Sequence, residues 1–231
     1  MLTLGEELLV VALDAEKGVV RGPAAMWIGL NAAGLADAVA AGWLRLRRPD
    51  GSPGVTVAGG GVVDLADQPL LGEVLFQARQ TQDGNRHPEW CLRNWDSPSL
   101  LAYLTSLRER GVLMWDRAKG GATYGRFHLL DADAAAAARA RVERVATNAG
   151  PSERDVDLAG IAHGIGLGKH LYKGRRNKPK REALATALEQ HPFAVMVARV
   201  LSEIQNQKFT FDSSNDLKMA TDMLNAWEHT P

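Results

Sequence analysis

The chain opens with a run of apolar residues that has the pattern of a capped helix. In the segment LTLGEELLVVALD, residues 2–14, Leu4 and Leu8 recur at helical spacing, and the other apolar residues widen the stripe to nearly every side. Thr3 followed three residues later by Glu6 is the pattern of a capping box, in which each residue bonds the other's backbone. A helix that is apolar all round is typical of the middle of a domain, so we expect this one to be buried.

Helical periodicity dominates the rest of the chain as well. A second, alanine-rich helix is expected to end at Gly42. Further helices are predicted over residues 69–82, 87–95, 98–111, 131–147, 157–172 and 180–205, with one more over 212–228. Strands are expected only as two short pairs, 43–48 with 54–65 and 112–115 with 123–130. The pattern therefore predicts a mainly α protein, one globular helical domain with small β-hairpins.

Composition limits where such a protein acts. The 231 residues suit one large domain or two small ones, and 27 basic residues balance 27 acidic ones, so no global field attracts nucleic acid or membrane. A single cysteine, Cys91, excludes an intramolecular disulfide and fits a reducing cytosol. No long uncharged apolar run predicts a spanning helix, and the acidic start is unlike a signal peptide. We expect a soluble, cytoplasmic protein that visits a membrane surface at most.

One local charge cluster stands out against this neutral background. The run KHLYKGRRNKPKR, residues 169–181 and called the basic segment below, carries almost no acidic residue; its cations are Lys169, Lys173, Arg175, Arg176, Lys178, Lys180 and Arg181. Gly174 and Pro179 place its middle in a loop between two helices. Each cation near an anionic bilayer contributes about 1 kcal/mol, screened within a Debye length. A solvated charged loop, and phosphate or nucleic-acid binding, are the alternatives.

Catalytic patterns are weak. A glycine-rich run before Lys169 departs from the phosphate-binding loop pattern at His163 and His170, and we interpret its glycines as packing residues. The six histidines show no metal-binding spacing. Glu6 and Glu7 are expected to be capping and surface residues rather than a catalytic pair. The sequence predicts a non-enzymatic protein without metal or cofactor.

Five blocks of sequence resemble one family in conserved order. They are LTLGEELLVVALDAEKG, GLADAVAAGWLRL, DQPLLGEVLFQA, LLAYLTSLRERGVL and DLAGIAHGIGLGKHLY. Together they are similar to the Golgi phosphoprotein 3 family, whose eukaryotic members are peripheral membrane adaptors that bind phosphatidylinositol 4-phosphate. The resemblance implies a family domain over residues 1–205 and a helical extension over 206–231 that lies outside the match.

The resemblance also implies where a lipid headgroup would bind, and the residues there differ from the family pattern. A Trp and three Arg of the family site fall on Gly22, Asn31, Ser97 and Leu100. Without a guanidinium, such a site loses the bidentate bonds that hold a phosphate. A shifted alignment through Arg21 and Trp27 would restore part of it. We therefore expect anionic lipid binding through the basic segment, and specific phosphatidylinositol 4-phosphate recognition is doubtful.

The hairpin over residues 112–130 corresponds to an element through which family members self-associate. Trp115, Tyr124 and Phe127 put aromatic side chains on or beside it. Three roles stay open for them: packing on the chain's own core, an interface between copies of the chain, or a tip that inserts into a membrane.

The expected partners are an anionic phospholipid or phosphoinositide headgroup, a client protein and a second copy of the chain, with reversible binding at the cytoplasmic face of a membrane. A second hypothesis is a winged-helix regulator, because helix 98–110 precedes a hairpin. Arg108 and Arg110 lie only at the end of that helix, and the chain is neutral, so nucleic acid is not an expected partner. A third hypothesis is a cytosolic scaffold that recruits another protein.

Overall fold

The computed structural model describes residues 1–47, 51–58, 69–81, 87–96, 98–116 and 126–207. The described chain is mainly α, as predicted. Its α-helices are α1 (Leu4–Ala12), α2 (Pro23–Ala40), α3 (Pro69–Gln80), α4 (Pro88–Asn94), α5 (Leu100–Glu109), α6 (Ala132–Thr147), α7 (Glu153–Gly164), α8 (Gly168–Leu171), α9 (Lys178–Leu188) and α10 (Pro192–Gln207). A short 3-10 helix, η3 (Arg175–Asn177), precedes α9. The helix expected over 212–228 lies outside the described residues.

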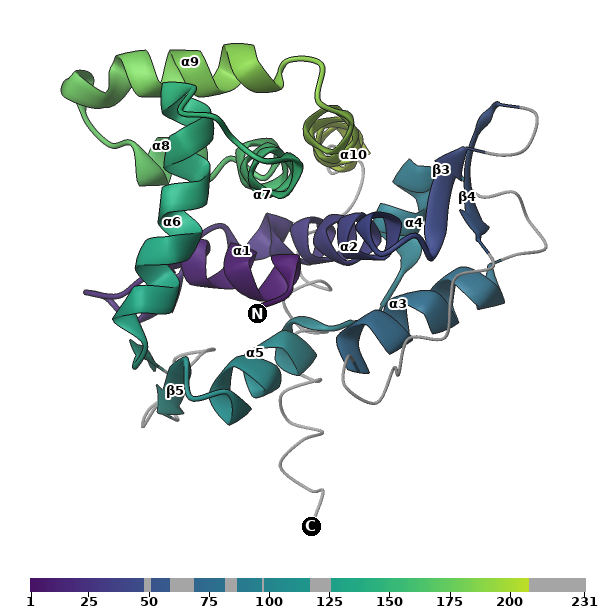
Figure 1. Cartoon of the computed structure of the whole chain (residues 1–231), viewed down its shortest axis with the longest axis horizontal. Coiled ribbons are helices and arrows are strands. Elements are labelled where there is room, and N and C mark those ends of the chain that lie inside the picture. Colours follow the sequence, from purple (N-terminus) through teal and green to yellow (C-terminus); the bar gives the residue numbers. More distant parts are fainter. Residues whose placement is uncertain (48–50, 59–68, 82–86, 97, 117–125, 208–231) are drawn as a thin grey trace.

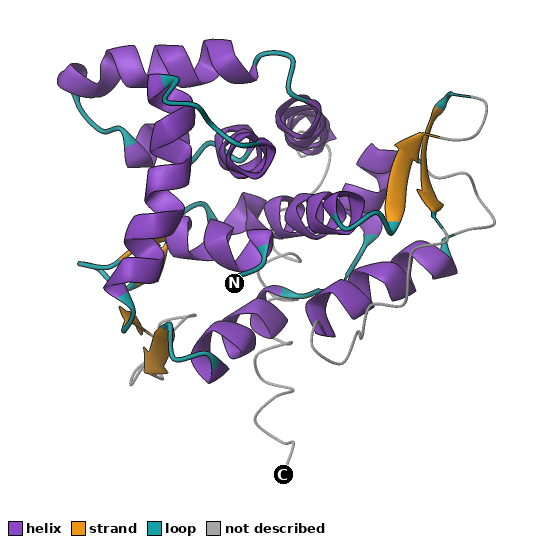
Figure 2. Cartoon of the chain, in the orientation of Figure 1, coloured by secondary structure: helices purple, strands orange, loops and turns teal. Residues whose placement is uncertain are grey.

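The described strands form three antiparallel pairs at the edges of the helical body, as Figure 2 shows. They are β1 (Leu13–Asp14) with β2 (Val19–Val20), β3 (Leu44–Arg47) with β4 (Pro53–Val57), and β5 (Leu113–Asp116) with β6 (Arg126–Leu129). The second and third pairs were expected from the sequence, while β1 and β2 were not. None of the three is large enough to form a core of its own, so the helices carry the fold.

α1 and α2 occupy the middle of the molecule (Figure 1). Every residue of α1 is buried, and the helix packs against α2, α5, α6 and α7. α2 in turn contacts α3, α4, α7 and α10. Figure 1 places α7, α9 and α10 on one side of this pair and α3 and α5 on the other, while α6 runs past the end of α1 from one side to the other. The prediction that the opening helix is buried is confirmed.

Several predicted helix starts are found as expected. Thr3 and Glu6 form the complete capping box of α1, with the Glu6 amide donating to Thr3 Oγ1 over 3.2 Å and Thr3 N donating back to Glu6. Asp131 caps α6 by accepting from the amide of Ala134. α5 differs: its N-cap is Ser99 and it begins at Leu100, two residues later than the predicted start at residue 98.

Two of the predicted helices are each broken in the structure. The segment predicted as one helix over 157–172 divides into α7 and α8 at Gly166, whose φ of 83° lies in the left-handed region that glycine tolerates. The segment predicted over 180–205 divides into α9 and α10 before Pro192, which lacks the amide that a continuing helix would need. In both places the apolar periodicity runs across the break, so the pattern alone did not reveal it.

α7 and α10 pack closely because α7 carries glycine where they meet. A Cβ on Gly164 would lie 2.9 Å from Val197, and a Cβ on Gly160 would lie 2.5 Å from the His191 ring. Real Cβ atoms do not come this close to a neighbour, so an alanine at either position would force the helices apart. Of the glycines in the run before Lys169, Gly164 is therefore a packing residue, as the sequence analysis expected, whereas Gly166 allows the turn between α7 and α8 and has no neighbour within 4 Å of a Cβ.

Asn31 joins α2 to the end of α4 inside the core. Its side-chain amide donates to the carbonyls of Leu92 and Trp95 over 3.0 and 2.8 Å. We expect Asn31→Ala to lower the free energy of unfolding by about 2 kcal/mol, because two buried carbonyls lose their donor. Asn94→Ala is the control, since Asn94 makes a single such bond, to Trp90, at the surface. Urea denaturation measures both, and equal losses in the two variants would contradict the assignment.

Candidate functional site

The basic segment forms a compact turn between α8 and α9. The chain leaves α8 at Leu171, turns at Gly174, whose φ is 84°, and passes through η3 into α9. The side-chain amide of Asn177 donates to the carbonyl of Lys173 over 2.8 Å and closes the turn. The prediction that the middle of the segment is a loop between helices is confirmed, and the loop has a defined backbone.

Two of the seven cations are engaged in holding this turn. Arg181 donates to the carbonyl of Tyr172 and, over 2.9 Å, to that of Gly174. Lys180 pairs with Glu143 on α6 and lies 5.9 Å from the centre of the Tyr172 ring. The hydrogen bond from Lys180 lowers the pKa of Glu143. Arg181 therefore holds the turn together, and Lys180 links the segment to α6.

The remaining five cations are exposed. Lys178 forms a surface ion pair with Glu182 one turn later, over 3.4 Å. Lys169, Lys173, Arg175 and Arg176 have no ion pair among the described residues. A surface pair costs little to open, so Lys178 stays available as well. The sequence identified the charge cluster, and the structure separates five available cations from two that are engaged.

An ion pair near the start of the chain lies beside the basic segment. Arg21 pairs with Asp14 at the β1–β2 turn. The pKa of Asp14 is lowered by the hydrogen bond from Arg21 and, to a smaller extent, by the charge of Lys173. Asp14 therefore lies near the basic segment, and it engages the guanidinium of Arg21.

The positions that align with the family headgroup site hold no phosphate-binding arrangement among the described residues. Asn31 is buried and bonds the end of α4 as described above. Gly22 takes a left-handed conformation before α2, and Leu100 is half-buried. Trp27 is 38% exposed on α2. Ser97 lies outside the described residues.

The hairpin residues are placed unevenly. Phe127 is 3% exposed and belongs to the core. Trp115 lies in β5, directly opposite Phe127 in the strand pair. Tyr124 lies outside the described residues. Met114, on the outward face of β5, is 44% exposed. The role of the hairpin as an interface or a membrane tip stays a prediction. Because Phe127 is buried, its own role is packing in the core.

The helix that precedes the hairpin has one face packed on the protein and one of its two terminal arginines engaged. α5 buries Tyr103, Leu104 and Leu107. Arg110, at its end, lies 3.1 Å from Glu6 and donates to the carbonyl of Met1. The order of helix and hairpin matches a winged helix, but the described cations at the helix end are partly engaged within the protein.

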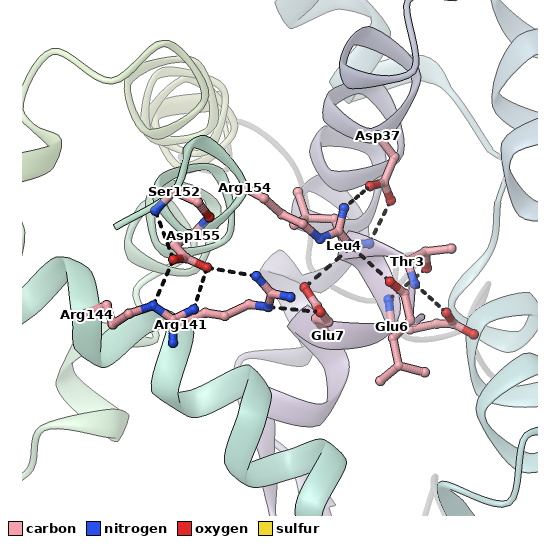
Figure 3. A network of polar contacts seen from close by, with 11 residues as sticks. Thr3, Leu4, Glu6, Glu7, Asp37, Arg141, Arg144, Ser152, Arg154 and Asp155 are labelled. Carbon is pink, nitrogen blue, oxygen red and sulfur yellow. Dashed lines mark hydrogen bonds and ion pairs between the residues drawn. The ribbon is translucent and has the colours of Figure 1, made fainter. Parts of the chain in front are cut away.

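A buried polar network, drawn in Figure 3, is the largest feature that the sequence analysis missed. The expectation that Glu6 and Glu7 lie at the surface is wrong: their exposed fractions are 0% and 5%. Glu6 accepts from Ser106 of α5 over 2.6 Å in addition to its capping bond. Glu7 lies 3.2 Å from Arg141 and 3.4 Å from Arg154. Because α1 is apolar on every side, its two carboxylates are buried with it.

Asp155 is the centre of the second half of the network (Figure 3). Arg144 donates to both of its carboxylate oxygens over 2.9 Å, and Arg141 donates to one of them over 2.9 Å. Ser152 and Asp155 form the capping box of α7. Burial raises the pKa of Asp155, but the hydrogen bonds from Arg144, Ser152 and Arg141 outweigh it, so the pKa is well below its ordinary value.

The first residues of the chain are held by the same network. Arg154 donates to Asp37 over 2.7 Å and to the carbonyl of Leu2 over 2.9 Å, while Asp37 accepts from the amide of Leu4 over 2.7 Å. Burial raises the pKa of Asp37 and of Glu7, against the opposing charge of Arg154. The sequence did hold a signal for this network: two acidic residues stand in a helix that is otherwise apolar on every side. Arginines at 141, 144 and 154 were available as partners for them.

Substitution of the central carboxylate tests the network. We expect Asp155→Asn to lower the free energy of unfolding at about pH 7 by about 3 kcal/mol, because Arg144 loses its anionic partner and Arg141 keeps only Glu7. Since the native pKa is lowered, this contribution is complete above the ordinary value of 3.8 and declines as the pH falls below it.

Urea denaturation at about pH 7, 5 and 2.5 measures the difference between the two proteins, which should be similar at the first two and smaller at the last. Glu153→Gln is the control, because Glu153 is exposed in the same helical turn. A difference that grows on acidification would contradict the lowered pKa.

A second substitution tests the two classes of cation in the basic segment. Arg181→Ala removes the donor to two loop carbonyls, and we expect a loss of about 1 kcal/mol in the free energy of unfolding. Arg176→Ala removes an exposed cation and should change stability by less than about 0.5 kcal/mol. Thermal denaturation compares the two directly, and equal effects would mean that Arg181 does not hold the turn.

Within the described ranges, no group of His, Cys, Asp and Glu is arranged to hold a metal ion. His163 is half-buried, and burial lowers its pKa. No helix in the described part of the chain is long and apolar enough to cross a bilayer.

Comparison with known families gives one match. The model of the Golgi phosphoprotein 3 (GPP34) family matches residues 4–204, which is most of the chain. A comparison with curated proteins found none that matches. The match begins at the first residue of α1 and ends within α10, so it spans the whole described body.

Proposed function

The chain belongs to the Golgi phosphoprotein 3 family, and from that premise we propose that it is a non-enzymatic peripheral membrane protein that binds anionic lipid through the basic segment. The observation that carries the proposal is the set of five exposed cations along the basic segment, from α8 through the turn to the start of α9: Lys169, Lys173, Arg175, Arg176 and Lys178. Such a cluster attracts the negative surface of a bilayer without inserting into it.

Magnitudes support reversible binding. Each cation near the surface contributes about 1 kcal/mol, so five give an affinity that salt and a change of lipid charge can reverse. The overall charge of the chain is zero, so the residues outside the basic segment carry an excess of seven acidic residues, which weakens the attraction to an anionic surface. Binding that depends on one small cluster suits an adaptor that moves between a membrane and the surrounding solution.

Selective recognition of phosphatidylinositol 4-phosphate is not part of the proposal. Asn31, which aligns with one of the family's arginines, is engaged with backbone carbonyls. Arg21, the nearest guanidinium in sequence to the start of α2, pairs with Asp14. A headgroup would therefore meet the cluster as a general anion, with charge density rather than stereochemistry deciding the affinity.

Charge reversal tests the proposal. We expect the triple variant Lys173→Glu, Arg175→Glu and Arg176→Glu to lose at least about 100-fold in affinity for acidic vesicles, because three attractions become repulsions. Thermal stability should stay unchanged, since these side chains hold no element in place. Vesicle co-sedimentation with phosphatidylserine-containing liposomes measures the affinity, and neutral liposomes give the baseline.

A matched variant separates local from global charge. Arg45, Arg79 and Arg108 are exposed cations outside the basic segment, and their triple change to Glu alters the net charge by the same amount. This variant should bind acidic vesicles as the unmodified protein does. Equal loss in the two variants, or binding that survives reversal of the segment, would overturn the proposal.

A third vesicle composition examines selectivity. Liposomes with phosphatidylinositol 4-phosphate and liposomes with phosphatidylserine are compared at equal surface charge, and we expect equal binding. A preference for the phosphoinositide would show that a headgroup site forms elsewhere on the molecule. Failure to bind any acidic vesicle would favour a scaffold in solution instead.

A further inference from the structure

A pocket of about 490 Å³ lies beside the first residues of the chain. Its walls come from α2, α3 and α5 and from the residues that precede α1, with Arg154 of α7 at one side. None of the described residues that line it belongs to the basic segment. The volume is in the range of pockets that hold small molecules in proteins.

One wall of the pocket is aliphatic. Leu70, Leu71 and Val74 of α3 form it, and Leu2 adds apolar surface from the start of the chain. Apolar surface that leaves the water on binding stabilises a complex in proportion to its area. The pocket therefore suits a ligand with a hydrocarbon body, whose polar head must find its partners on the other walls.

The wall formed by α2 is electronegative. Gly34 and Asp37 lie one turn apart on this wall, and the helix ends at Ala40. The carbonyl end of a helix carries about half a negative charge, which adds to the carboxylate of Asp37. Each oxygen of that carboxylate accepts one hydrogen bond, from the Leu4 amide or from Arg154, and each can accept a second. Asp37 therefore has room for another donor.

Tyr103 brings a buried hydroxyl to the same wall. A Cβ on Gly5 would lie 2.4 Å from the Tyr103 ring, and a Cβ on Gly34 would lie 3.3 Å from the Tyr103 hydroxyl. Glycine at both positions leaves room for a large ring that is only 1% exposed. The hydroxyl makes no hydrogen bond with the described residues, so its lone pairs are available to a donor in the pocket.

The charged groups that act on this hydroxyl are carboxylates. Burial raises the pKa of Tyr103, and the charges of Asp37, Glu6 and Glu73 raise it further. Burial also raises the pKa of Asp37, where the charge of Arg154 opposes the rise and that of Glu6 adds to it. The acidic groups therefore repel one another, and a cation between Asp37 and Tyr103 would reduce that repulsion.

The two arginines in the pocket walls are already paired with carboxylates. Arg110 lies 3.1 Å from Glu6. Arg154 donates to Asp37 over 2.7 Å and lies 3.4 Å from Glu7. Their charges are offset by these partners, so they attract little further negative charge into the pocket. The electrostatics favour a cationic head over an anionic one.

We infer that this pocket binds an aliphatic primary amine as its ammonium ion. The ammonium donates to Asp37 and to the Tyr103 hydroxyl beside the carbonyl end of α2, and the methylene chain lies against the leucines of α3. A primary ammonium is a compact charge with three donors, which matches these acceptors. The inference does not rest on the proposed function, because the pocket and the basic segment share no described residue.

Calorimetric titration with decylammonium, and with decanoate as the matched anion, tests the inference. We expect decylammonium to bind one equivalent. Decanoate should bind at least about tenfold more weakly, because its head meets carboxylates and loses the charged hydrogen bonds. Hexylammonium to dodecylammonium extend the series, and the thermal shift of the protein gives a second readout.

Three variants and one control locate the binding. Asp37→Asn keeps the shape of the side chain, removes its charge and should weaken decylammonium binding at least about tenfold. Tyr103→Phe removes only the hydroxyl and should weaken it about threefold or more. Ala40→Leu fills the pocket from the exposed end of α2 and should weaken binding without altering a charge. Glu189→Gln, exposed at the end of α9, changes the net charge as Asp37→Asn does and should leave binding unchanged.

Ala40→Leu keeps the test decisive if Asp37→Asn is too unstable to assay. Asp37 holds the Leu4 amide and Arg154, whereas the side chain of Ala40 makes no hydrogen bond. Thermal denaturation without ligand shows which variants are folded, and only folded variants are titrated.

Each contrary result has a definite reading. Equal binding of decylammonium and decanoate would overturn the inference, and so would no binding by any alkylammonium from hexyl to dodecyl. Binding that Ala40→Leu leaves unchanged would place the ligand outside the pocket and overturn it as well. Equal weakening by Glu189→Gln and Asp37→Asn would mean general attraction of a cation and no site. Vesicle binding through the basic segment is measured separately, so none of these results bears on the proposed function.

Discussion

Two glutamates on a helix without an exposed side set the main constraint on this fold. α1 is buried along its whole length, so Glu6 and Glu7 enter the interior with it. An isolated carboxylate there would cost several kcal/mol, and only well-placed cations and donors offset that cost. The arginines come from α5, α6 and α7, which must therefore meet α1 at particular positions.

Because each carboxylate needs its own cations, the network fixes how the helices are arranged around α1. Asp155 joins two arginines of α6 to the first turn of α7, and Arg154 joins α7 to α2 and to the residues before α1. Apolar residues of similar volume would be about as stable in such a place, so the gain from the charges is a defined arrangement of helices. A shift of α7 by one turn would separate Asp155 from both α6 arginines.

Much of the fold was predictable because its signals are local. The Thr3–Glu6 capping box, the Asp131 cap and the β3–β4 and β5–β6 pairs depend on residues close together in sequence. The breaks at Gly166 and Pro192 were missed because apolar residues recur at helical spacing on both sides of each. The burial of Glu7 was missed because its partners, Arg141 and Arg154, lie more than a hundred residues away.

The sequence predicted which cations make up the basic segment, but it did not predict which of them are engaged within the protein and which are available. The charge run is visible in the sequence, yet nothing local distinguishes Lys180 from Lys178. The distinction depends on Glu143, 37 residues earlier on α6, and on backbone carbonyls that the turn brings to Arg181. The pocket around Tyr103 was likewise invisible, because Gly5, Gly34 and Tyr103 meet only after three helices have packed.

The turn that Arg181 and Asn177 close has a consequence for how the basic segment meets a partner. Its backbone is already fixed by bonds to Gly174 and Lys173, so little conformational freedom is left to lose on contact. What remains to be ordered is the side chains, each of which costs about 0.5–1.5 kcal/mol when immobilised. Encounters with a charged surface then need no prior rearrangement, and their rate follows long-range attraction and ionic strength rather than a folding step.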